Sequence, residues 1–246
     1  MEGTLDRIES PELDRPIHVW RYGHFGLPVL VFPSASGMAH EWQKEGMIDV
    51  IAPLLAAGKV KLYCVESNVS EAWTRKETPI DWRMDRHHRY ERWVLDRMVP
   101  YIRKDCRWPD APITTVGCSL GGTYAVNFAL KFPEVFRRGM GFSGRYLTSE
   151  VAGKHSSTGL YFNNPLAYMS NIGGDALERV RRNTKLTLVC GRGKWEEGCI
   201  EETIALGELM DRIGVPNDTD IWGYESYHDW PWWRLQVAHH FGRIFG

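Results

Sequence analysis

Short apolar runs of strand length alternate with amphipathic helical patterns along most of this 246-residue chain. Strand-like runs lie at Ile17–Tyr22, Val29–Phe32, Lys61–Val65, Ile113–Cys118, Arg138–Phe142, Leu186–Cys190 and Thr219–Trp222. Helical patterns lie at Met47–Ala57, Tyr90–Ile102, Ile200–Ile213 and Trp232–Phe245. This alternation predicts an α/β fold in which a mostly parallel central sheet carries helices on both faces.

The segment Arg145–Asn183 interrupts this alternation, because it is irregular and rich in Gly, Ser and Asn. It lies between two predicted strands, so it forms either a small cap across the carboxyl ends of the sheet or a plain surface excursion. No internal repeat, low-complexity tract or linker divides the rest of the chain. A length of 246 residues suits one α/β domain. We therefore expect residues 1–246 to form a single domain, with 145–183 as a cap-like insertion.

One motif carries the strongest chemical signal. The strand-like run ending at Cys118 leads into a Gly-x-Ser-x-Gly sequence centred on Ser119, and a helical pattern over 124–130 follows at once. Such a turn strains the serine backbone, so its close neighbours must be small, and Gly117 and Gly121 meet that need. The motif predicts Ser119 as an exposed nucleophile at the carboxyl end of a strand. Cys118 is the weaker candidate, because the turn presents the serine.

A serine nucleophile needs a base, which in this fold follows a late strand of the sheet. His228 comes a few residues after the run Thr219–Trp222 and precedes the last helical pattern, where the base belongs. His239 and His240 lie within that helical pattern, and His155 lies in the irregular segment, before the strand that precedes the acid. The sequence therefore predicts His228 as the general base.

The orienting acid should follow the strand-like run that ends at Cys190. That loop, residues 191–198, contains no Asp, so a Glu must serve if the triad is complete. Glu196 and Glu197 are adjacent and point in different directions. We favour Glu196 and keep Glu197 as the alternative, because the next glutamates, from position 201 on, lie in a helical pattern.

The tetrahedral intermediate of acyl transfer needs N–H donors for its oxyanion. One donor is the backbone N–H of Leu120, the residue after the nucleophile. The other should come from the loop Pro33–Gly37, whose small residues allow a close approach of substrate. Its proline has no N–H, so Ser34, Ala35 or Ser36 must donate, and we favour Ala35.

The charge balance argues against two classes of partner. The chain has 30 basic and 31 acidic residues, a net charge of −1, which gives no reason to expect nucleic acid or an anionic membrane as a partner. No apolar stretch is long enough to span a bilayer, and the N-terminus has no signal-peptide pattern. Five cysteines without a CxxC motif fit reduced thiols in a cytoplasmic protein. The sequence leaves open whether the chain forms a homo-oligomer.

No metal or cofactor is predicted. The pairs His87-His88 and His239-His240 are adjacent in sequence, and we expect neighbours on one helix or strand to face different ways. The chain has no HExxH motif, no Cys/His cluster, no GxGxxG motif and no P-loop.

The chain resembles the esterase D-like branch of the α/β-hydrolases, which includes carboxylesterases, S-formylglutathione hydrolases, enterobactin esterases and mycolyltransferases. The matching segments are 117–122, Glu91–Ile102, Asn163–Leu166 and His228–Arg234, the last with a His-x-Trp-x-x-Trp pattern. The resemblance covers about Val29 to Phe245. It implies an α/β-hydrolase fold and places the serine, acid and histidine roles on Ser119, Glu196 and His228. Many relatives have Asp as the acid, whereas this chain offers Glu.

These observations together predict a serine carboxylesterase that cleaves small acyl esters through an acyl-enzyme. A small-molecule ester is the expected partner. Two alternatives use the same fold. An acyltransferase would keep the triad but accept an alcohol or thiol in place of water, and a non-catalytic binding protein would not use the triad at all.

Overall fold

An eight-stranded sheet forms the centre of the molecule, with the strand order β1-β2-β4-β3-β5-β6-β7-β8. The computed structural model describes residues 1–153 and 155–246. The strands are β1 (Thr4–Ile8), β2 (Ile17–Tyr22), β3 (Leu27–Phe32), β4 (Val60–Val65), β5 (Ile113–Cys118), β6 (Phe136–Phe142), β7 (Lys185–Cys190) and β8 (Asn217–Ile221). β2 pairs antiparallel with β1 and β4, and every other pairing is parallel. The predicted α/β fold with a mostly parallel sheet is confirmed.

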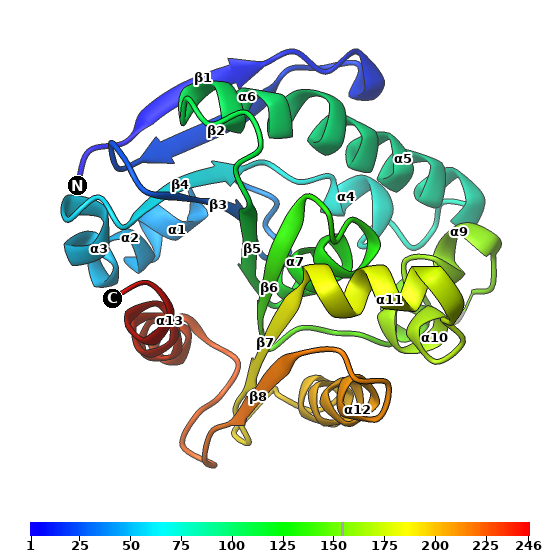
Figure 1. The fold of residues 1–246 in the computed structure, drawn as a ribbon. Coiled ribbons are helices and arrows are strands. Elements are labelled where there is room, and N and C mark those ends of the chain that lie inside the picture. The colour runs from blue at the N-terminus through cyan, green and yellow to red at the C-terminus, as the bar shows by residue number, and fades with distance from the viewer. Residues whose placement is uncertain (154) are drawn as a thin grey trace.

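Helices cover both faces of this sheet (Figure 1). One face packs against α1 (Glu41–Lys44), α2 (Met47–Val50), α3 (Ala52–Ala56) and α13 (Trp230–Phe245). The other packs against α4 (Val69–Ala72), α5 (Ile80–Trp93), α6 (Val99–Asp105), α7 (Leu120–Lys131), α11 (Gly174–Asn183) and α12 (Cys199–Arg212). Because both faces are covered, β4 and β5 are buried along their whole length. No helix of the described residues is long and apolar enough to cross a membrane.

Several elements differ from the sequence-based expectation for local reasons. The expected helix over Met47–Ala57 is two short helices that meet at Ile51, because Pro53 cannot donate a helical hydrogen bond. The expected helix over Tyr90–Ile102 begins earlier, in α5, and passes through a π-helical turn, Val94–Met98, directly before the first turn of α6, which contains Pro100. A short 3₁₀ helix, Pro11–Leu13, follows β1.

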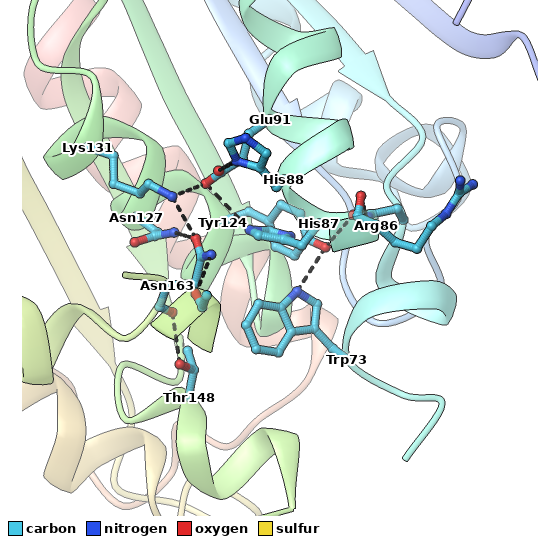
Figure 2. A network of polar contacts seen from close by, with 12 residues as sticks. Trp73, Arg86, His87, His88, Glu91, Tyr124, Asn127, Lys131, Thr148 and Asn163 are labelled. Atoms are coloured by element: carbon cyan, nitrogen blue, oxygen red, sulfur yellow. Dashed lines mark hydrogen bonds and ion pairs between the residues drawn. The ribbon is translucent and has the colours of Figure 1, made fainter. Parts of the chain in front are cut away.

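The insertion of residues 145–183 contributes α8 (Thr148–Ala152), α9 (Thr158–Tyr161), α10 (Pro165–Met169) and α11. Its described residues pack against α5, α7 and α12. Asn163 anchors it, since its Oδ1 accepts hydrogen bonds from Nδ2 of Asn127 and Nζ of Lys131, both at 2.9 Å (Figure 2). Its carbonyl accepts a further bond from Thr148 Oγ1 at 2.8 Å. A cap across the carboxyl ends of the sheet stays a prediction.

Candidate active site

Ser119 occupies a sharp turn between β5 and α7. Its backbone has φ 56° and ψ −127°, a conformation that is strained for a residue with a side chain. A Cβ on Gly117 would lie 2.3 Å from the carbonyl carbon of Gly121, and a Cβ on Gly121 would lie 2.4 Å from the carbonyl oxygen of Phe32. The turn therefore closes only because both positions are glycine, and it leaves Ser119 partly exposed at the end of the strand.

The structure brings the three predicted triad residues together from separate loops. Oγ of Ser119 lies 2.9 Å from Nε2 of His228, which follows β8. Nδ1 of the same imidazole lies 3.0 Å from Oε2 of Glu196, which follows β7. All three loops leave the carboxyl ends of parallel strands, so the sheet places their side chains at one edge. The result is an unbroken line of polar contacts from hydroxyl to imidazole to carboxylate.

Glu196 is only 1% exposed, and donors surround its carboxylate. Oε1 accepts a hydrogen bond from Ser143 Oγ at 2.6 Å and a longer one from the N–H of Gly191 at 3.4 Å. The thiol of Cys190 donates to Oε2 at 3.4 Å. These contacts leave the carboxylate one orientation, with Oε2 toward the imidazole.

Trp233 fixes the direction of this hydrogen-bond chain. Its indole nitrogen, which can only donate, lies 3.0 Å from Ser143 Oγ. The Ser143 hydroxyl accepts that bond and donates its own hydrogen bond to Glu196. The same indole packs edge-on against the ring of His228, with ring centroids 4.8 Å apart. Trp233 therefore contacts the imidazole directly and the carboxylate through Ser143.

Among the described residues, none of the other acids of the segment contacts His228. Glu197 is exposed and makes no side-chain hydrogen bond or ion pair with the described residues. Glu201 accepts the N–H of Gly198 at 2.6 Å at the start of α12. Glu202 is buried and accepts the N–H groups of Tyr146 at 2.5 Å and Leu147 at 2.7 Å, so it holds the start of the insertion.

The other histidines weighed from the sequence lie away from Ser119. His155 is exposed in the insertion. His240 is buried in α13 and contacts Oδ2 of Asp220 at 3.0 Å. His239 is exposed beside it, and the two adjacent rings have centroids only 5.0 Å apart. The expectation that these neighbours cannot face one ion is wrong, since ligand atoms of His239, His240 and Asp220 all lie within 4.8 Å of one another.

The loop after β3 is built around a buried carboxylate. Glu41 accepts the N–H of Ser34 at 2.7 Å and its hydroxyl at 2.6 Å, and it also accepts the hydroxyl of Ser36. The N–H groups of Ser36 and Gly37 bond within the loop. Over the part of the chain that the structure describes, the N–H of Ala35 is the one in this loop left without a protein partner. The N–H of Leu120 is the first of α7 and likewise has no intrahelical acceptor.

Besides Cys190, two further cysteines lie close to this site. Cys118 is fully buried, and burial raises the pKa of its thiol well above the ordinary value, which keeps it protonated. Cys199 lies at the start of α12, with Sγ 3.8 Å from His228 Nδ1. Burial and the neighbouring Glu196 raise the pKa of the Cys199 thiol to about 12.

Sequence reasoning missed Ser143, Glu41 and Cys199. Ser143 carried one usable signal, because it follows directly after a predicted strand, at the edge where the other site residues gather.

The sharp turn at Ser119 is a nucleophile elbow. Together with the line of hydroxyl, imidazole and carboxylate at the carboxyl edge of the sheet, it defines an α/β-hydrolase arrangement. A family model described as "Putative esterase" matches residues 31–244, and the chain belongs to this family. The resemblance stated from the sequence is thereby confirmed.

Solved structures show the same fold at low sequence identity. A ferulic acid esterase has a TM-score of 0.74 at 17% identity, covering 99% of this chain and 97% of the other. S-formylglutathione hydrolase (FrmB) from Staphylococcus aureus has a TM-score of 0.73 at 14% identity, covering 100% and 99%. Mycobacterium tuberculosis MPT51 (FbpC1) has a TM-score of 0.73 at 13% identity, covering 100% and 98%. A search of curated proteins found no match.

Proposed function

We propose that this protein is a serine carboxylesterase that cleaves small acyl esters, with Ser119 as nucleophile, His228 as general base and Glu196 as orienting acid. The observation that carries the proposal is the hydrogen-bonded line from Ser119 through His228 to Glu196. Membership of the esterase family supports it, as do structural neighbours named as a ferulic acid esterase and an S-formylglutathione hydrolase.

Acylation uses the polarity of this line. With Glu196 accepting from Nδ1, the bare Nε2 of His228 accepts the hydroxyl proton of Ser119 as Oγ attacks the ester carbonyl carbon. The carbonyl π electrons move onto oxygen, and the tetrahedral intermediate forms. Its collapse breaks the bond to the alcohol oxygen, which leaves with the proton from His228. Ser119 then carries the acyl group.

Deacylation repeats these steps with water. His228 takes a proton from water as the water oxygen attacks the acyl carbon, and it returns the proton to Ser119 Oγ as the acid product leaves. Glu196 accepts from Nδ1 throughout and stabilises the imidazolium. No metal or cofactor takes part in this scheme.

The oxyanion of each intermediate would bind the free N–H groups of Leu120 and Ala35. The Leu120 N–H also lies at the positive end of the α7 dipole, which favours developing negative charge. The carbonyl oxygens of Phe32 and Pro33 lie against Gly121, so the Ala35 loop starts directly beside the elbow. Glu41 then holds the loop in shape from beneath.

Covalent labelling tests the proposal. A fluorophosphonate probe should label the parent protein and leave Ser119→Ala unlabelled, and the parent alone should hydrolyse a short-chain p-nitrophenyl ester. Labelling without hydrolysis, with acyl transfer to an added alcohol or thiol, would identify an acyltransferase on the same residues. If the folded parent is neither labelled nor active on the ester, the chain is a non-catalytic binding protein.

A further inference from the structure

Three potential metal ligands of different chemistry meet behind His228. Nδ1 of His228 lies 3.0 Å from Glu196 Oε2 and 3.8 Å from Cys199 Sγ, and the three atoms all lie within 4.8 Å of one another. A tetrahedral Zn²⁺ with bonds of about 2.0 to 2.3 Å holds its ligand atoms about 3.3 to 3.8 Å apart. The three atoms therefore need to move little to share one ion.

The donor set selects among cations. A thiolate, an imidazole nitrogen and a carboxylate oxygen are the three ligand types that Zn²⁺ takes in proteins, and the fourth position would hold water. Mg²⁺ and Ca²⁺ prefer oxygen ligands, and Cys199 and His228 supply none. Burial and Glu196 raise the pKa of the Cys199 thiol despite the nearby guanidinium of Arg145, which pairs with Glu202. The metal itself must therefore displace the thiol proton.

One ligand of the cluster, Glu196, borders a groove on the acid side. This groove of about 230 Å³ is lined by Arg192, Gly193, Glu196, Glu197, Ile200, Glu201 and Tyr224. Three carboxylates against one guanidinium give it a negative charge, which raises the local concentration of cations. Glu196 is shared between this groove and the triad.

We propose that Glu196, Cys199 and His228 bind Zn²⁺ reversibly and that the bound ion switches off the esterase. The inhibition, though not the binding, rests on the proposed function. On binding, the Cys199 S–H bond breaks and its proton goes to solvent. The Nδ1 proton of His228 also leaves to solvent, and Nε2 takes up a proton in its place, so the imidazole changes tautomer and stays neutral. Sulfur, Nδ1 and Oε2 then each donate a lone pair to the ion. No electron is transferred, so the site needs no oxidant or reductant.

Inhibition follows because the two ring nitrogens of His228 cannot bind the ion and accept the Ser119 proton at the same time. A neutral His228 with Zn²⁺ on Nδ1 carries its proton on Nε2, so it has no lone pair for the proton of Ser119. Zn²⁺ also takes Oε2 of Glu196 away from the imidazole. The ion therefore blocks proton transfer without contacting Ser119.

The cluster of Asp220, His239 and His240 supplies an internal control. It is a second place where Zn²⁺ could bind, but it lies at the end of β8 and along α13, with no contact to Ser119. His239→Gln removes an exposed ligand from this cluster alone. Zinc inhibition should survive that change.

The test combines a spectroscopic and a kinetic readout. Co²⁺ added to the metal-free protein should give thiolate-to-metal charge-transfer absorption, which Cys199→Ser abolishes and Cys106→Ser keeps. Zn²⁺ should inhibit hydrolysis of a p-nitrophenyl ester, and EDTA should restore it, whereas Mg²⁺ and Ca²⁺ should have no effect. Relative to its own zinc-free rate, Cys199→Ser should need at least about tenfold more Zn²⁺ for half inhibition, since a ligand is lost.

Equal zinc sensitivity in Cys199→Ser and the parent would overturn the proposal, and so would sensitivity that disappears with His239→Gln. If the parent hydrolyses no ester but shows the Cys199-dependent Co²⁺ absorption, the metal site stands and the proposed esterase fails. If hydrolysis depends on Ser119 but the absorption is absent, the esterase stands and the metal site fails. Cys199→Ala repeats the test if the serine variant does not fold.

Discussion

The hydroxyl of Ser143 lies 2.6 Å from Oε1 of Glu196, the carboxylate oxygen that does not face His228. Ser143 is fully buried and has φ 52°, so the chain holds a residue with a side chain in a strained conformation directly after β6. That strain places the hydroxyl between the indole of Trp233 and the carboxylate. Ser143 therefore acts as a positioning residue for the proposed acid.

Replacing Ser143 by alanine should lower kcat by about ten- to a hundredfold with a smaller change in KM. A hydrogen bond to a charged group contributes about 1.5 to 3 kcal/mol, and each 1.4 kcal/mol is about tenfold in rate. Steady-state kinetics on a p-nitrophenyl ester measure the effect. The same change in a Glu196→Gln background should cost much less, because the group that Ser143 positions is already altered.

Trp233→Phe is the matched control for this prediction. It keeps the ring against His228 but removes the indole donor, so the Ser143–Glu196 bond survives and the rate should fall less than in Ser143→Ala. If Ser143→Ala lowers the rate equally in the parent and in the Glu196→Gln background, Ser143 supports only the fold.

Ser119→Ala should remove nearly all hydrolysis, by at least about three orders of magnitude, because no other hydroxyl or thiol of the described residues is hydrogen-bonded to Nε2 of His228. Cys118 is the nearest alternative in sequence, but its buried thiol stays protonated. Kinetics and circular dichroism on the same preparation separate loss of chemistry from loss of fold. Activity comparable to the parent would end the serine-hydrolase proposal.

Substitutions of the two adjacent glutamates should have very different effects on kcat. Glu196→Gln should lower kcat by at least about a hundredfold, because the amide keeps the shape but loses the charge that stabilises the imidazolium. Glu197→Gln should change kcat by no more than a fewfold, since this side chain is exposed. Parallel kinetics on both variants decide the matter. The reverse order would move the acid to Glu197.

The local pattern of the sequence was enough for the central fold. A strand, a glycine-flanked serine and a helix are consecutive in the chain, so the elbow at Ser119 follows from short-range rules. The exception is β1, Thr4–Ile8, which the apolar pattern did not indicate, because this edge strand is largely exposed and carries charged residues. Pro53 also broke a helix that the periodicity alone predicted.

The surroundings of the acid depend on contacts that no local pattern contains. Glu196 and Glu197 are neighbours, and which of them turns inward depends on Ser143, which lies 53 positions from Glu196, and on the packing of Trp233. Likewise, Gly198 and Cys199 come close to the site only because β7 and β8 place their loops together. Sequence supplied the candidates, and tertiary packing selected among them.

His87 provides a test of the buried layer between α5 and α7. Its ring packs edge-on between Trp73 and Tyr124, at 5.2 and 5.1 Å between ring centroids (Figure 2). Neither ring nitrogen has a hydrogen-bond partner among the described residues, and Nε2 lies 3.7 Å from Oε1 of Glu91. Burial lowers the pKa of His87 to about 4. The carboxylate of Glu91 acts to raise this pKa, whereas the charges of Lys131 and His88 lower it further.

Stability should therefore fall as the pH drops from about 6.5 to about 4, because the unfolded chain, with an ordinary histidine pKa near about 6.5, binds a proton that folded His87 refuses. The loss attributable to this residue is on the order of 3 kcal/mol across that window. His87→Phe keeps the aromatic contacts and removes the proton site, so its free energy of unfolding should depend less steeply on pH. Urea unfolding of both proteins at intervals from pH 7 to pH 4.5 measures the two slopes. Identical slopes would show that His87 is not the group responsible.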